Sequence, residues 1–151
     1  MTAHKEESDE ESLKRGITHD ELVSQAILFF VAGYDTTAAT IGFLAYHLAV
    51  NPDKQDKLWE EIERVVGDKE QVLDSDLHSM PYLDMCVSET LRIIPPAQVI
   101  DRVAARDVNV KGIRLPAGAG VTVPVYHMHH CEELYPEPEK FKPERLVTVF
   151  K

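Results

Sequence analysis

An acid and an alcohol stand next to each other in the middle of the most apolar stretch of the chain. The stretch covers residues 26–50, and its centre reads Ala32-Gly33-Tyr34-Asp35-Thr36-Thr37. On a buried helix such a pair can relay protons to a bound reactant, because the carboxylate takes them up and the hydroxyl hands them on. A glycine in a helix costs about 1 kcal/mol relative to alanine. Gly33 therefore indicates either close packing of another helix, with the threonines bonded to carbonyls one turn back, or a flat ligand against the backbone.

A second candidate is the pair Glu89 and Arg92, at positions i and i+3 of the string Ser88-Glu89-Thr90-Leu91-Arg92. This spacing places a carboxylate and a guanidinium on one face of a helix, where they can pair. Taken alone the pair is a weak signal, because an exposed helical ion pair contributes only about 0.3–0.5 kcal/mol. Its meaning depends on what else the chain contains.

Four strings follow one another in an order that is typical of a known family. They are Ala32-Gly33-Tyr34-Asp35-Thr36, Glu89-Thr90-Leu91-Arg92, Pro95-Pro96 and Phe141-Lys142-Pro143-Glu144-Arg145. In order and separation they resemble the oxygen-activating central helix, the E-x-x-R helix and the F-x-P-E-R-F segment of the cytochrome P450 haem-thiolate monooxygenases, with Leu146 in place of the final phenylalanine. The resemblance covers about residues 18 to 146. Asp101-Arg102-Val103 and the segment 112–118 further resemble the microsomal branch that includes the family-three enzymes and thromboxane synthase.

The resemblance implies a role for each matching residue. Asp35 and Thr36 would deliver protons to the oxygen that the haem activates, while Ala32 and Gly33 would leave room for haem and oxygen. Arg102 would bind a haem propionate, because a guanidinium can donate two parallel hydrogen bonds to a carboxylate. A buried ion network and an apolar substrate lining complete the implied set: Glu89, Arg92 and Arg145 for the network; Phe29, Phe30, Val31, Ala97, Gln98, Val99 and Ile100 for the lining.

The resemblance also implies the function of the parent enzyme. It would use haem to insert one oxygen atom of O2 into a lipophilic organic substrate, with electrons from an NADPH-dependent reductase, at the membrane of the endoplasmic reticulum. The family's cysteine loop, F-x-x-G-x-R-x-C-x-G, does not occur before Lys151. We therefore expect an interior piece of a longer enzyme that is inactive and holds haem poorly by itself. The alternative is a non-catalytic helical binding module that has lost the haem site.

Capping residues, prolines and glycines predict the elements that must position these side chains. A capping box at Thr18 and Glu21 begins a long helix that ends before Pro52. Further helices are predicted at residues 53–66, 74–77 and 81–94, and strands at 99–103, 108–110, 113–115 and 121–123, with an irregular segment from residue 127. The fold class is thus mainly α with a small β-sheet (α+β), as in a partial cytochrome P450 fold from the long central helix to the F-x-P-E-R segment.

Composition narrows the possible partners. The chain has 151 residues and a formal net charge of −10, which argues against nucleic acid as a partner. Its two cysteines, Cys86 and Cys131, provide no disulfide framework and fit a reducing compartment. We expect residues 1–16 to form an acidic flexible tail and residues 17–151 to form the incomplete cytochrome P450 domain.

The apolar stretch and the histidine-rich string each allow a second interpretation. The apolar stretch could span a membrane, but Asp35 at its centre and the lack of flanking Lys and Arg favour a buried core helix, so we expect no span in this chain. The string His127-Met128-His129-His130-Cys131 could bind zinc or copper if it were extended, but no second ligand pair stands at a suitable separation. We expect no metal site there.

Overall fold

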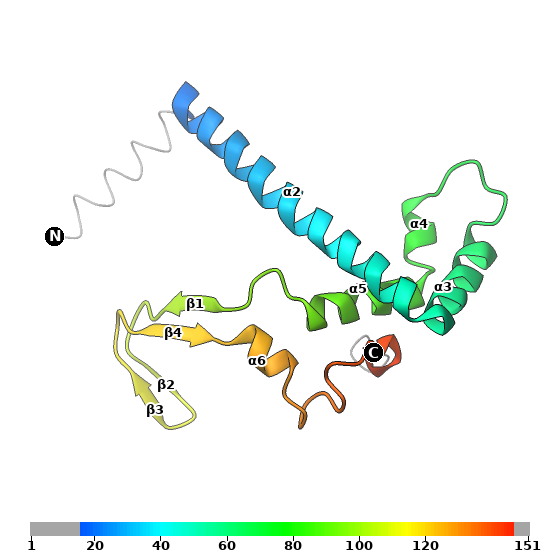
Figure 1. The fold of residues 1–151 in the computed structure, drawn as a ribbon. Coiled ribbons are helices and arrows are strands. Elements are labelled where there is room, and N and C mark those ends of the chain that lie inside the picture. The colour runs from blue at the N-terminus through cyan, green and yellow to red at the C-terminus, as the bar shows by residue number, and fades with distance from the viewer. Residues whose placement is uncertain (1–15, 147–151) are drawn as a thin grey trace. The chain divides into compact units, whose positions relative to one another are not determined.

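The computed structural model describes residues 16–146 (Figure 1). The expected acidic tail, up to residue 15, lies outside the described residues, as do residues 147–151. Two compact units divide the chain, residues 1–38 and residues 39–151. The elements, in order, are α2 (His19–Val50), α3 (Pro52–Val65), α4 (Asp74–Leu77), α5 (Pro81–Ile93), β1 (Ile100–Val103), β2 (Val108–Val110), β3 (Ile113–Leu115), β4 (Gly120–Val123), α6 (Val125–His129) and the 3-10 helix η1 (Pro143–Leu146).

Helix α2 begins at the predicted capping box. The Glu21 carboxylate accepts a hydrogen bond from the Thr18 amide at 2.9 Å, and the Thr18 hydroxyl accepts one from the Glu21 amide at 3.3 Å. The helix ends before Pro52, which begins α3, because proline disfavours a helical conformation in the residue before it. These local signals determine both ends of a 32-residue helix.

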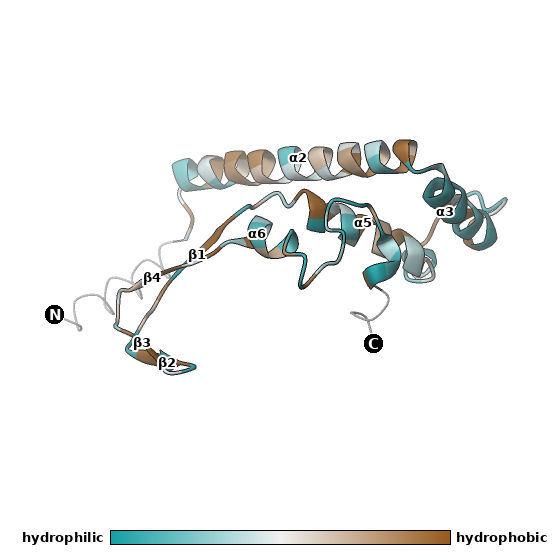
Figure 2. Ribbon diagram, turned by 60° about the horizontal axis from the view of Figure 1, so that its bottom comes forward, coloured by the Kyte–Doolittle hydropathy of each residue, from teal (hydrophilic) through white to brown (hydrophobic). Residues whose placement is uncertain are grey.

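Most of α2 is exposed within the described residues, so its burial in the core of a longer enzyme stays a prediction. The helix is long and apolar enough to cross a membrane by length and composition alone, and none of its most apolar window is buried by the described residues. Figure 2 shows hydrophobic positions along its length, in contrast to the mostly hydrophilic α3. Only the last two turns, from Leu44 onward, contribute to the core described below.

The strands form two separate two-stranded antiparallel sheets, where the sequence predicted one small sheet. Strands β1 and β4 pair with Ile100 opposite Val123, whereas β2 and β3 form a hairpin with Val108 opposite Leu115. The hairpin turns at Lys111 and Gly112. Both residues have positive φ (49° and 88°), as the two central residues of a type I′ hairpin turn require. The mainly helical α+β class is confirmed, and the strand pairing is the correction.

The segment from residue 125 is more regular than predicted. Residues 125–129 form helix α6 and residues 143–146 form η1, where the sequence indicated an irregular segment. Helix α6 is only five residues long, too short for a hydrophobic period to be visible in the sequence.

The hydrophobic core lies within residues 39–151. Its buried members are Leu58, Tyr82, Cys86, Ile93 and Phe141, which come from α3, α5 and the segment before η1. Leu44 and Leu48 of α2, together with Ile62, Leu83, Met85 and Ile94, pack against them. The core thus encloses one side of α5, the helix that carries the E-x-x-R string.

Candidate functional site

The Glu89 carboxylate is the centre of a buried polar network on α5. Glu89 is fully buried and Arg92 is 3% exposed. Arg92 donates from Nε to Glu89 Oε2 at 2.8 Å and from Nη2 to Glu89 Oε1 at 3.0 Å, so both carboxylate oxygens are engaged. The spacing of one helical turn brings the two side chains to the same face. This pair is therefore buried and bidentate, unlike the exposed helical pair that is the simplest interpretation of the sequence.

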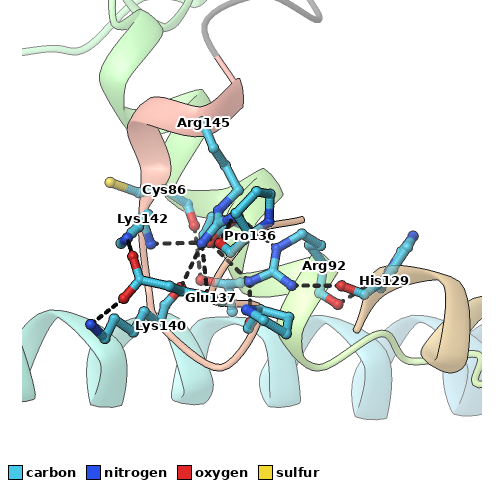
Figure 3. Close-up of polar contacts among 11 residues, drawn as sticks. Cys86, Arg92, His129, Pro136, Glu137, Lys140, Lys142 and Arg145 are labelled. Carbon is cyan, nitrogen blue, oxygen red and sulfur yellow. Dashed lines mark hydrogen bonds and ion pairs between the residues drawn. The ribbon is translucent and has the colours of Figure 1, made fainter. Parts of the chain in front are cut away.

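Arg145, from the distant F-x-P-E-R string, joins the same carboxylate (Figure 3). Its Nε donates to Glu89 Oε1 at 3.0 Å across 56 positions of sequence. The backbone amide of Lys142 donates to the same oxygen at 3.0 Å. The structure thus brings Glu89, Arg92 and Arg145 together, and it adds a main-chain donor that the sequence could not indicate.

Backbone carbonyls accept further hydrogen bonds from both arginines. Arg92 donates to the carbonyls of His129 (2.8 Å) and Pro138 (2.7 Å). Arg145 donates to the carbonyls of Pro136, Glu137 and Lys140 at 2.7 to 3.2 Å. Figure 3 shows the contacts of Arg145 gathered at the segment before η1, whereas Arg92 also reaches His129 on α6. Because any residue carries a carbonyl, no residue type in the sequence marks these acceptors; their effect is to tie α5, α6 and residues 136–145 into one scaffold.

Glu144, inside the F-x-P-E-R string, forms a second polar contact point that sequence analysis missed. Its Oε1 accepts from Lys57 at 2.9 Å, from Lys54 at 3.2 Å and from the Tyr82 hydroxyl at 3.1 Å. Partial burial opposes ionisation, but the hydrogen bonds from the two lysines outweigh it and hold the pKa of Glu144 at about 2. Burial in turn raises the pKa of Tyr82, and the charge of Glu144 adds to this effect. Glu144 therefore connects η1 to both α3 and α5.

A buried acid also caps α5 at its first turn. Glu61 of α3 is 7% exposed, and its carboxylate accepts from the amides of Tyr82 (3.1 Å) and Leu83 (2.9 Å). The first amides of a helix have no partner within it and attract negative charge, so this contact fixes the start of the E-x-x-R helix. A capping residue 21 positions away in sequence gives no local signal.

The predicted acid and alcohol lie on the part of α2 that belongs to residues 1–38. The Thr36 hydroxyl donates to the Ala32 carbonyl one turn back at 2.7 Å, as one of the two explanations of this stretch requires. No described atom lies within 4 Å of the position that a Cβ on Gly33 would occupy. Asp35 and the predicted lining residues Phe29, Phe30 and Val31 are exposed.

Arg102 and the second predicted lining segment lie around β1. Arg102 is exposed, pairs across the sheet with Val121, and donates from Nη1 to the Asp101 carbonyl at 2.8 Å. Ala97, Gln98 and Val99 precede the strand, and Ile100 begins it. All four are exposed, and the Gln98 carbonyl accepts from the Tyr126 amide at 3.1 Å, which joins this segment to α6.

Cys86 does not have the environment of a thiolate ligand. Cys86 is fully buried, and burial, with the charges of Glu144 and Glu61, raises the pKa of its thiol to about 12. Cys131 is half-buried and follows α6. A thiol with such a raised pKa is protonated at neutral pH, whereas metal binding requires the thiolate.

The histidine-rich string is helical, which corrects the extended arrangement weighed above. His129 bonds through Nδ1 to the Arg92 carbonyl at 3.1 Å, and His130 bonds through Nδ1 to the Tyr126 carbonyl at 2.9 Å. His130 also stacks on Tyr126, with ring centroids 4.1 Å apart. Among residues 16–146 no group of three His, Cys, Asp or Glu side chains is arranged to hold a metal ion.

A scaffold helix carrying a buried E-x-x-R pair, joined by an arginine of an F-x-P-E-R string, is the arrangement that the sequence motifs implied. The family model described as Cytochrome P450 matches residues 1–147. The chain belongs to the cytochrome P450 family.

Curated relatives place the chain beside one branch of that family. It is 43% identical over all 151 residues to cytochrome P450 3A29 of Sus scrofa, and it covers 30% of that protein. It is 42% identical to cytochrome P450 3A12 of Canis lupus familiaris and 39% identical to cytochrome P450 3A2 of Rattus norvegicus, each over 146 residues, which are 97% of this chain and 29% of each relative. The resemblance to the family-three branch is confirmed, and the chain spans about three tenths of the length of these relatives.

Proposed function

We propose that the chain provides the central helix and the E-x-x-R scaffold of a haem-dependent monooxygenase at the membrane of the endoplasmic reticulum. The complete enzyme inserts one oxygen atom of O2 into a lipophilic organic substrate, using electrons from an NADPH-dependent reductase. The observation that carries the proposal is the closed network of Glu89, Arg92 and Arg145. Buried charges are costly unless each has partners, and here two motifs far apart in sequence supply them to one carboxylate.

The residues of this chain fit part of a haem site. Within residues 1–38, no described atom lies within 4 Å of the Cβ position of Gly33, which suits the approach of a flat ring. Within residues 39–151, and considered separately, the exposed Arg102 guanidinium suits a propionate carboxylate. When bound with a cysteine thiolate ligand, haem would supply O2 binding and O–O cleavage. Cys86 does not fit that ligand position because it is buried as a neutral thiol, and neither Cys86 nor Cys131 stands in an F-x-x-G-x-R-x-C-x-G string.

Asp35 and Thr36 are proposed to handle protons. Asp35 is exposed on the helix, next in sequence to Thr36. The Thr36 hydroxyl donates its hydrogen to the Ala32 carbonyl at 2.7 Å. To serve in proton transfer it rotates away from that carbonyl, donates its proton toward the open space beside Gly33 and takes up a replacement proton from water.

The substrate class is proposed from the exposed apolar positions. One group of exposed apolar residues precedes Gly33 on α2: Phe29, Phe30 and Val31. The other lies before and at the start of β1: Ala97, Val99 and Ile100, with the polar Gln98 among them. Exposed aromatic and aliphatic side chains bind apolar surface by removing it from water. A lipophilic substrate therefore suits these positions better than a charged one.

By itself, the 151-residue chain is proposed to be catalytically inactive. Titration of the purified chain with haemin, followed by reduction under carbon monoxide, tests this directly. We expect no Soret shift of the thiolate type, because neither cysteine stands in an F-x-x-G-x-R-x-C-x-G string. A stable complex with that shift would refute the proposal and favour a complete site.

A chimera tests the function of the segment in a full-length protein. The matching residues of the pig relative, cytochrome P450 3A29, are replaced by this chain, which aligns with it over all 151 residues. We expect a thiolate-type reduced carbon monoxide spectrum and NADPH-dependent oxidation of a lipophilic substrate. A folded chimera that binds haem but oxidises nothing would favour the alternative of a non-catalytic module.

A further inference from the structure

His47, near the C-terminal end of α2, occupies an unusual position for an imidazole. Its side chain is 8% exposed, and its Nε2 has no hydrogen-bond partner. The ring lies flat against Phe141, with centroids 4.8 Å apart and planes inclined by 2°, while Tyr46 meets its edge at 5.6 Å. Phe141 is the first residue of the F-x-P-E-R string, so this stack connects the end of the central helix to the segment that carries Arg145.

The charged groups around His47 offer no partner to a positively charged ring. On α5, Glu89 attracts positive charge and Arg92 repels it. The Glu89 carboxylate already accepts four hydrogen bonds, from Arg92 twice, from the Lys142 amide and from Arg145, which is about its full capacity. Burial and Arg92 together outweigh Glu89, and the pKa of His47 falls below its ordinary value.

A cavity of about 470 Å³ gives solvent a route to this ring. Besides His47, Tyr46 and Phe141, it is lined by charged residues of two other segments: Asp53 and Lys54 of α3, and Glu139, Lys140 and Lys142 before η1. Lys54 pairs with Asp53 and Glu144, and Lys140 and Lys142 pair with Glu137, so these lysines are already neutralised. Protons can therefore reach His47, and among residues 16–146 its Nε2 has no hydrogen-bond partner.

We propose that His47 is a pH-sensitive latch that holds the C-terminal end of α2 against Phe141 when neutral and releases it when protonated. The neutral ring fits a buried aromatic stack with one unsatisfied nitrogen. The imidazolium carries two N–H donors and a charge, and it lacks an acceptor for Nε2. Stacking of a cation on Phe141 recovers only part of the cost of burying an unpaired charge. Acidification therefore loosens the contact between the C-terminal end of α2 and the F-x-P-E-R string at Phe141.

Hydrogen exchange of the full chain tests the latch. Amide protection of residues 44–50 and 139–143, corrected for the intrinsic effect of pH, is measured from pH 8 to pH 5. We expect both segments to lose protection together in the wild-type chain as the pH falls. In His47→Gln, whose side chain does not titrate, we expect the protection of both segments to stay constant from pH 8 to pH 5. His78→Gln is the matched control, because His78 is 77% exposed and lies on another segment, and it should show the wild-type loss.

A second measurement keeps the test decisive if His47→Gln fails to fold. The imidazole signals of His47 in the wild-type chain are followed by NMR across the same pH range. We expect their midpoint to lie below the ordinary histidine value and to coincide with the loss of protection. The proposal is overturned if His47 titrates without that loss, if His47→Gln shows the same loss, or if neither segment is protected at pH 8.

Discussion

Replacement of Glu89 by glutamine perturbs the network with almost no change of shape. In the wild-type chain, Oε1 accepts hydrogen bonds from Arg92 Nη2, Arg145 Nε and the Lys142 amide, and Oε2 accepts one from Arg92 Nε. Glutamine keeps one acceptor oxygen and presents an NH2 group at the other position. That group must face at least one N–H donor, so a buried donor loses its partner.

The structure sets the size of the effect. Arg92 is 3% exposed, and the Arg145 side chain is 13% exposed, so water cannot replace the lost carboxylate. Removing one partner of a buried ion pair costs about 3–5 kcal/mol, because the other charge stays buried without compensation. We expect Glu89→Gln to lose about this much of a free energy of unfolding that is typically about 5–15 kcal/mol for a domain.

Urea unfolding monitored by circular dichroism measures this loss. Glu137→Gln is the matched control: it is the same chemical change at an exposed acid, whose partners Lys140 and Lys142 are also exposed. We expect no resolvable loss in that control. Equal unfolding midpoints for Glu89→Gln and the wild-type chain would refute the reasoning, because the network would then contribute nothing to stability.

Three further predictions concern other residues. Glu144→Gln should destabilise the chain by only about 1 kcal/mol, because this acid is 37% exposed. In the variant, the free energy of unfolding should also fall less steeply as the pH is lowered. The sign follows from the depressed pKa of Glu144: its contribution is present above pH 4.5 and is lost as the pH falls through about 2, so unchanged acid unfolding in the variant would contradict it. In native buffer at pH 8 a thiol reagent should label Cys131 and spare Cys86, whose pKa is about 12, whereas both should react in urea; equal native rates would count against the burial of Cys86. In the chimera, Thr36→Ala should increase the reductant consumed per product formed, with Thr40→Ala as control; unchanged coupling would exclude the proposed proton role of Thr36.

Local chemistry explains why so many elements could be predicted. The Thr18–Glu21 capping box, the break at Pro52 and the Lys111-Gly112 turn each act within a few residues, so their effect is visible in the sequence. The order of the motifs likewise identified the family before any geometry was known. The E-x-x-R spacing predicted one shared helix face, because a helix repeats every 3.6 residues.

The remaining features depend on segments that meet only after folding. Helix α6 is too short to show a period, and the division into two sheets depends on which strands come within hydrogen-bonding reach. The cap that Glu61 places on α5 and the contacts of Glu144 join positions 21 to 90 apart, which no local pattern encodes.

The sequence by itself determined the family, the helical elements and the identity of the charged residues. Only the tertiary structure decided that Glu89 is fully buried with four donors, that Cys86 is a neutral thiol and that the His47 ring stacks on Phe141 without a partner for Nε2. The physical reason is that burial sets the cost of a charge, and burial is a property of the packed chain rather than of any residue in it.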